Sequence, residues 1–130
     1  MKMRVITTSA PAGAGIVELP PVVSPVRLIA GHCVILAGAT DVQFALECGM
    51  ILDGVFASLV SAGHSAQVPF GQSFSVDWGI GLALMSNATL ASMTVPLWDD
   101  LVIGPEHRVR ILTDGVVASI TALRFVVLDL

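Results

Sequence analysis

Charged residues are scarce in this 130-residue sequence. They make up 12% of the chain, about half the usual share, and the net charge is −4. Lys2 is the single lysine, and three of the five arginines lie between residues 108 and 124. A surface that follows nucleic-acid phosphates needs a basic patch or stripe. Arg108 and Arg110 alternate with apolar residues, which predicts an outward strand face, and we expect no direct contact with nucleic acid.

The motifs of common catalytic sites are also missing. No serine lies in a G-x-S-x-G elbow, and "GQSFS" at Gly71–Ser75 is not one. The segment "PAGAGIVELP" contains glycines, but it has neither a G-x-G-x-x-G spacing nor the Lys-Ser/Thr pair of a phosphate-binding loop. We therefore expect no enzymatic activity, no catalytic residues and no cofactor.

Histidines and acidic pairs give no better candidate for a site. The three histidines are 32 and 43 residues apart, a spacing that matches no local metal-ligand motif: His32, His64 and His107. Asp99-Asp100 is the one acidic pair, and adjacent strand residues point to opposite faces. A solvated turn is the preferred interpretation of this pair, and no metal site is expected.

Cysteine is limited to Cys33 and Cys48, and neither belongs to a C-x-x-C pair. A disulfide between them would require adjacent strands in a suitable register. We favour free, buried thiols that behave as small apolar groups.

Apolar residues, in contrast, make up 55% of the chain, more than the usual ~45–50%. This balance predicts a folded chain, because disorder needs low hydrophobicity and high charge. The few charges cannot cover the surface of so small a domain. Large exposed apolar patches would favour aggregation, so we expect a homo-oligomer or a component of a larger assembly.

The charge-free window from Trp78 to Trp98 is long enough to span a bilayer and has a tryptophan at each end. Small or polar residues at Ser86–Thr89 interrupt it, and Gly79, Gly81 and Pro96 suit turns and strand ends. Strands are therefore preferred to a transmembrane helix here, and a membrane partner is not expected.

Short apolar or alternating runs that end at Gly, Pro, Asp or Asn recur along the chain. This pattern predicts an all-β, single-domain β-sandwich, jelly-roll-like, with about eight strands. We assign residues 1–25 to an extended N-terminal arm, in which Arg4–Thr8 forms either a first strand or part of the arm, and residues 26–130 to the sandwich. The arm is expected to lie over a neighbouring molecule.

Strand candidates within the sandwich include 26–36, 41–47, 107–112 and 118–128. In the second of these, Val42, Phe44 and Leu46 should face the core, and Asp41, Gln43, Ala45 and Glu47 the opposite side. Asp114-Gly115 and Ser86-Asn87 are predicted turns, and the first is a hairpin signal. The run 50–61 allows a bulged strand, a hairpin turn at Asp53-Gly54 or a short helix.

The two tryptophans lie beside aspartates, where a core meets a surface. They could pack in the core or serve as interface anchors, since buried tryptophans often dominate contact energies. The candidate interface residues are Trp78, Trp98, Pro20 and Pro21.

The C-terminal segment "WDDLVIGPEHRVRILTDGVVASITALRFVVLDL" resembles the C-terminal part of small β-rich virion proteins of tailed bacteriophages. The matching residues are Leu101–Ile103, Gly104-Pro105, Arg108–Ile111, Thr113, and Ile120–Val127 with Arg124. A looser similarity covers "ELPPVVSPVRLIAGHCVILAGATDVQFALECG".

This resemblance implies a non-enzymatic capsid decoration or cement protein that stabilises a phage head. Its partners would be copies of itself, as a dimer or trimer, and the major capsid protein. It would be located on the capsid surface after assembly in the host cytoplasm. Another head or tail component and a carbohydrate-binding jelly roll are the alternatives. The latter would have a cleft lined by Trp78 or Trp98.

Overall fold

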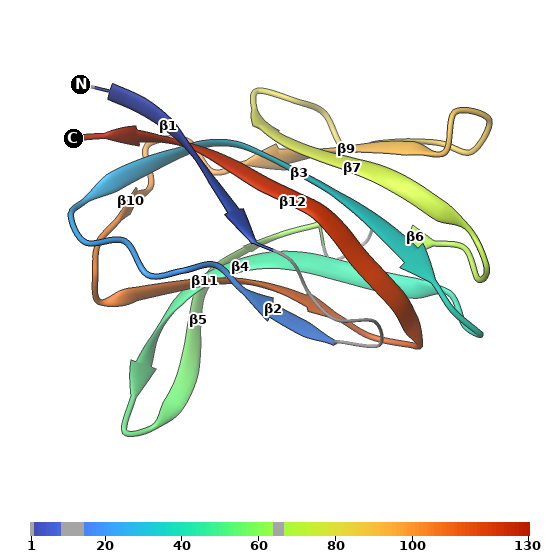
Figure 1. Cartoon of the computed structure of the whole chain (residues 1–130), viewed down its shortest axis with the longest axis horizontal. Helices are drawn as coiled ribbons and strands as arrows, with labels where there is room; N and C mark the ends of the chain where they lie inside the picture. The colour runs from blue at the N-terminus through green and yellow to red at the C-terminus, as the bar shows by residue number, and fades with distance from the viewer. Residues whose placement is uncertain (1, 9–14, 64–66) are drawn as a thin grey trace.

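The computed structural model describes residues 2–8, 15–63 and 67–130, and the regular elements in these ranges are all β-strands (Figure 1). The predicted all-β sandwich is confirmed. Eight of the twelve strands have six or more residues, in agreement with the predicted number, and four have two or three. The strands are β1 (Lys2–Thr8), β2 (Ile16–Glu18), β3 (Val26–Ala37), β4 (Val42–Leu52), β5 (Val55–Ala62), β6 (Gln67–Val68), β7 (Ser73–Ile80), β8 (Met85–Asn87), β9 (Ser92–Leu97), β10 (Val102–Ile103), β11 (His107–Thr113) and β12 (Val117–Asp129).

Two sheets face each other across the core. Sheet A has the order β1-β12-β3-β7-β9-β8, with β10 also paired to β3, and sheet B has the order β2-β11-β4-β5, with β6 also paired to β4. The pairing is nested, because β3 pairs with β12 in one sheet and β4 with β11 in the other. Such wrapping of early strands against late ones is the jelly-roll-like feature of the fold. The parallel pair β7–β9 departs from the antiparallel pattern of the other ladders.

The two Asp-Gly turns differ in what they connect. Asp53 and Gly54 both have positive φ, 52° and 79°, as a two-residue type I′ hairpin turn requires, and they join β4 to β5. At the second turn only Gly115 has a positive φ (66°). The expectation of a hairpin at Asp114-Gly115 was wrong, because β11 belongs to sheet B and β12 to sheet A.

The N-terminal segment contributes one strand to each sheet. β1 pairs with β12 along its whole length, and β2 pairs with β11. Val17 and Leu19 are buried members of the core. Residues 15–25 therefore stabilise the sandwich itself, in addition to any contact that they make with a neighbour.

Three aromatic rings join the sheets around a glycine. Phe125 and Trp78 are the direct neighbours of Gly31 on either side, and their rings are stacked with centroids 6.2 Å apart. Phe44 of sheet B meets Trp78 edge-on at 5.8 Å. Such aromatic pairs add roughly 0.5–1.5 kcal/mol beyond the burial of their area. A Cβ at position 31 would overlap the Phe125 ring, so glycine is what allows the two rings to close.

The outward face of β4 is more buried than its alternation predicts. Val42, Phe44 and Leu46 are in the core as expected, but Ala45 and Glu47 are buried too. The Glu47 carboxylate accepts a 3.1 Å hydrogen bond from Nε of Arg110, whose guanidinium lies 3.6 Å from the centroid of the Phe56 ring. Further residues of sheet B thus form a second, outer layer of packing.

The window from Trp78 to Trp98 forms strands and loops. Ser86-Asn87, expected to be a turn, belongs to β8, and the turn follows at 88–91. Among the described residues, no helix is long and apolar enough to cross a membrane.

Cys33 in β3 and Cys48 in β4 are buried and unbonded, as predicted. Burial raises the pKa of Cys48 to about 11. Burial also raises the pKa of Cys33, and the negative charge of Asp77 raises it further. Both thiols therefore remain protonated at neutral pH, and protonated thiols are poor nucleophiles.

We predict that neither cysteine of the native protein reacts with a thiol-specific dye at pH 8, because both thiols are buried and protonated. In denaturant both should react, as counted by mass spectrometry. Rapid labelling of either one in the native protein would show that its strand opens readily.

We also predict that Gly31→Ala lowers the free energy of unfolding by about 1–3 kcal/mol, the usual effect of overpacking a core. Denaturant unfolding measures this change. Gly15→Ala is the matched control, because the nearest atoms to its Cβ would lie 3.9 Å away. Equal stability of the two variants would contradict the packing described around position 31.

Candidate functional site

A polar row crosses the outer face of sheet A directly beside the aromatic core. Strand register places Arg124 of β12 next to His32 of β3, His32 next to Asp77 of β7, and Asp77 next to Thr94 of β9. Arg124, His32 and Asp77 are adjacent in sequence to the inward-facing residues of the aromatic core. These neighbours are, in the same order, Phe125, Gly31 and Trp78. Since successive strand residues face opposite sides, the inward packing fixes the outward row.

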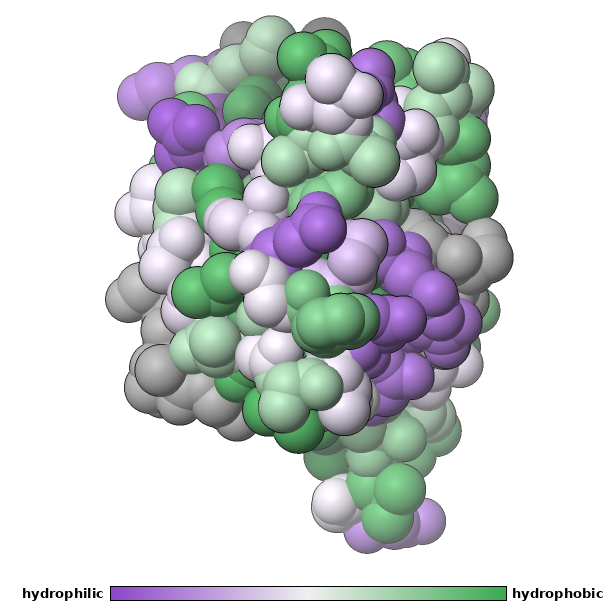
Figure 2. Space-filling model, turned by 90° about the vertical axis from the view of Figure 1, so that its right-hand side faces the viewer, coloured by the Kyte–Doolittle hydropathy of each residue, from purple (hydrophilic) through white to green (hydrophobic). Residues whose placement is uncertain are grey.

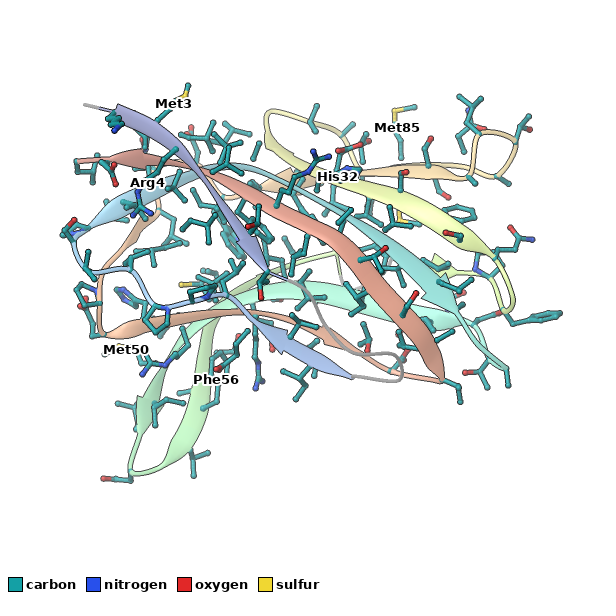
Figure 3. The ribbon with its side chains drawn as sticks, in the orientation of Figure 1. Met3, Arg4, His32, Met50, Phe56 and Met85 are labelled. Carbon is teal, nitrogen blue, oxygen red and sulfur yellow. The ribbon has the colours of Figure 1, made fainter. Side chains whose placement is uncertain are left out.

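His32 and Asp77 form the closest contact in this row. His32 Nδ1 lies 2.8 Å from Asp77 Oδ1, so its N–H donates to the carboxylate. The His32 side chain points away from the core, over the outer face of the sheet (Figure 3). Thr94 does not join the contact, because its hydroxyl donates to the carbonyl oxygen of Ala83.

A hollow of about 630 Å³ surrounds this pair; we call it the sheet A groove. Its floor includes the small residues Ala30 and Gly79, which are neighbours across β3 and β7. The other lining residues are mostly apolar: Val5, Ile29, Gly31, Trp78, Ile80, Leu82 and Val126, together with His32, Asp77 and Arg124. The groove is thus an apolar depression with one cation and one His-Asp pair.

An irregularity in β12 precedes Arg124. The register with β3 shifts between Thr121 and Arg124, and Ala122 has a positive φ of 53°. Such bulges re-aim the side chains that follow them. Arg124 forms no ion pair with any described residue, whereas Arg4, Arg27 and Arg110 each have an acidic partner.

The groove has few of the groups that catalysis needs. In the described part of the chain, no serine, threonine or cysteine side chain is hydrogen-bonded to His32. His107 lines a different crevice, near β1 and β2, and its Nδ1 accepts a hydrogen bond from the backbone N–H of Gly104. His64 lies outside the described residues. The described histidines are therefore not gathered at one site.

Carboxylates do not gather into a metal site either. Asp99 and Asp100 are exposed and lie 3.8 and 3.0 Å from the guanidinium of Arg27. Within residues 2–8, 15–63 and 67–130, no three His, Cys, Asp or Glu side chains are close enough to hold a metal ion.

The four candidate interface residues fall in three different environments. Trp78 is in the core and 1% exposed, so its ring is not accessible from the groove. Trp98 is half-buried, and its Nε1 donates to the carbonyl oxygen of Ser61. Pro20 and Pro21 are exposed beside the narrow crevice that His107 also lines.

The β4–β5 hairpin is a second surface feature, which the sequence reasoning did not identify as functional. β11 stops pairing with β4 at Met50, so the end of the hairpin projects beyond the body of the sandwich (Figure 1). Four large apolar side chains are exposed on it: Ile51, Leu52, Val55 and Leu59. In Figure 2 the projection is at the bottom of the molecule and is mostly hydrophobic. The apolar residues on both sides of Asp53-Gly54 were the available signal.

Comparison with known proteins adds no further assignment to these surfaces. No protein-family model, no curated protein and no solved structure matches the chain.

Proposed function

We propose that the chain is a non-enzymatic structural protein of a phage virion, a decoration or cement protein that stabilises the head. It binds copies of itself, as a dimer or trimer, and the major capsid protein, on the capsid surface after assembly in the host cytoplasm. The observation that carries this proposal is the large apolar surface left exposed on a sandwich whose core is already complete.

Nine of the seventeen exposed large apolar side chains of the described residues lie in two short stretches. One is the β4–β5 hairpin, where Leu52 and Val55 are 54% and 68% exposed. The other is the segment from Ile80 to Leu90, which borders the sheet A groove and includes exposed Leu82, Leu84 and Met85. Apolar surface concentrated in this way is typical of protein interfaces. It supports a protein that works by association.

Open sheet edges support the same conclusion. β5 ends sheet B and β1 ends sheet A, and both strands have at least seven residues. Long edges of this kind invite pairing with other chains unless something covers them. Assembly into a shell would cover them.

The resemblance of Trp98–Leu130 to virion proteins is what supports a virion protein in particular. In the fold this segment forms β10, β11 and β12, which pair with β1, β2, β3 and β4. The two long strands of this segment, β11 and β12, therefore each have a partner strand on both sides. Another head or tail component could be built from the same fold.

A carbohydrate-binding module has less support. The cleft expected for this alternative would need an accessible tryptophan ring, but Trp78 is enclosed by Phe44 and Phe125. Trp98 is half-buried, and its Nε1 donates a hydrogen bond to the carbonyl oxygen of Ser61. A glycan titration that shows binding in the groove would favour this alternative.

We predict that the purified protein forms a defined homo-oligomer at micromolar concentration, because the exposed apolar side chains lower their free energy by leaving water. Light scattering coupled to size-exclusion chromatography measures its mass. A stable monomer would contradict self-association.

We further predict that mass spectrometry of purified phage particles detects the protein in a constant ratio to the major capsid protein. The matched control is the cell lysate cleared of particles, in which no such constant ratio is expected. Particles that form with the gene expressed but lack the protein would contradict the virion assignment.

A further inference from the structure

The sheet A groove combines an apolar lining with a cation that has no acidic partner. Arg124 enters it from β12, and Asp77, the carboxylate nearest in the register, is already bonded to His32. Val5, Ile80 and Leu82 supply exposed apolar surface at its rim. Asp77 keeps its negative charge, but His32 lies between it and Arg124 in the register. A segment that fits this groove should therefore be apolar and should place one negative charge beside Arg124, at the end of the polar row away from Asp77.

The β4–β5 hairpin has this composition. Its turn places Asp53 at the tip, between Leu52 and Val55. Asp53 is exposed and, among the described residues, forms neither an ion pair nor a side-chain hydrogen bond. The two positive φ angles of the turn hold the tip in one conformation, which lowers the entropy cost of binding.

We propose that the β4–β5 hairpin of one molecule binds in the sheet A groove of a second copy, with Asp53 beside Arg124 and with Leu52 and Val55 against the apolar lining. This inference rests on the proposed role of the chain in an assembly, and it names the two surfaces that self-association uses. Both apolar packing and charge attraction would stabilise this contact. A charge pair that is enclosed by apolar side chains interacts more strongly than one in water.

The position of the two surfaces determines how copies are arranged. His32 points outward from sheet A, whereas the hairpin projects from sheet B on the opposite side of the molecule (Figures 1 and 3). A hairpin therefore cannot occupy the groove of its own chain. The contact is head-to-tail, and such contacts form rings when the rotation closes and filaments when it does not. A ring, such as the trimer, is the closed form that this contact gives.

The test is a charge exchange measured by analytical ultracentrifugation over a range of protein concentrations. Asp53→Arg and Arg124→Glu should each raise the concentration of half-association by about tenfold or more, because like charges then meet in the contact. The double variant D53R/R124E should return it close to that of the original protein, because the pair is restored with opposite polarity.

The matched control is E18R/R124E. Glu18 is an exposed acidic residue of β2, so this variant has the same net charge as D53R/R124E, but it cannot restore the pair. It should associate as weakly as Arg124→Glu alone. Thermal unfolding of all variants identifies any loss of fold, and Leu52→Ser tests the apolar part of the contact independently of charge.

Three results would overturn the inference: a monomeric protein, single variants that associate normally, or a double variant no better than its control. The proposed function is judged separately, by the presence of the protein in particles. A failed charge exchange with the protein present in particles would remove the hairpin contact alone, whereas absence from particles would remove the virion role.

Discussion

The closure of two aromatic rings over Gly31 is the constraint on which both faces of sheet A depend. Phe125 and Trp78 can meet because the strand between them has no side chain at that point, and Phe44 then ties the pair to the opposite sheet. A slip of one residue in any of these strands would turn the rings toward solvent. The same register brings His32 together with Asp77, which are 45 residues apart in the chain. The strand register that core packing requires thus also determines which side chains are neighbours on the outer surface.

The few ion pairs connect different parts of the fold. Arg4 and Asp129 join the first strand to the last, with Nε 2.9 Å from a carboxylate oxygen. Glu47 and Arg110 cover part of sheet B, at 3.1 Å. A partly exposed pair such as Arg4–Asp129 contributes little stability. In the mostly buried Glu47–Arg110 pair, the cost of removing both charges from water offsets much of their attraction. Most of the folding free energy must therefore come from apolar burial. The charges that remain without an ionic partner are therefore informative about what the surface can bind.

Local sequence signals predicted most of the fold. Period-two alternation identified β4 and β11, because burial on one face leaves that pattern in the residues themselves. Apolar runs bounded by turn residues identified β3 and β12. The second Asp-Gly turn misled us, since a dipeptide does not reveal whether the next strand stays in the same sheet. The burial of Glu47 was missed because its cover, Phe56 and Arg110, comes from neighbouring strands.

The candidate site could hardly be predicted from the sequence, because it too depends on how distant strands pair. Each histidine was assessed by its spacing to other histidines, whereas the contact of His32 depends on register between β3 and β7. The projection of the hairpin depends on where β11 ends relative to β4, which no residue of the hairpin encodes. Trp78 lies beside an aspartate, as expected where the core meets the surface. Because successive strand residues face opposite sides, its ring points into the core.

The position of β12 between β1 and β3 has a kinetic consequence. β1 has no partner strand, and β3 lacks one of its two long ladders, until residues 117–129 have been synthesised, so this side of sheet A cannot form progressively as the chain leaves the ribosome. Contacts of such long sequence separation are slow to form. During that delay β3 would expose an unpaired, apolar edge, the kind of surface that chaperones recognise and that leads to aggregation. Efficient production of this protein would therefore depend on how quickly its last strand is inserted.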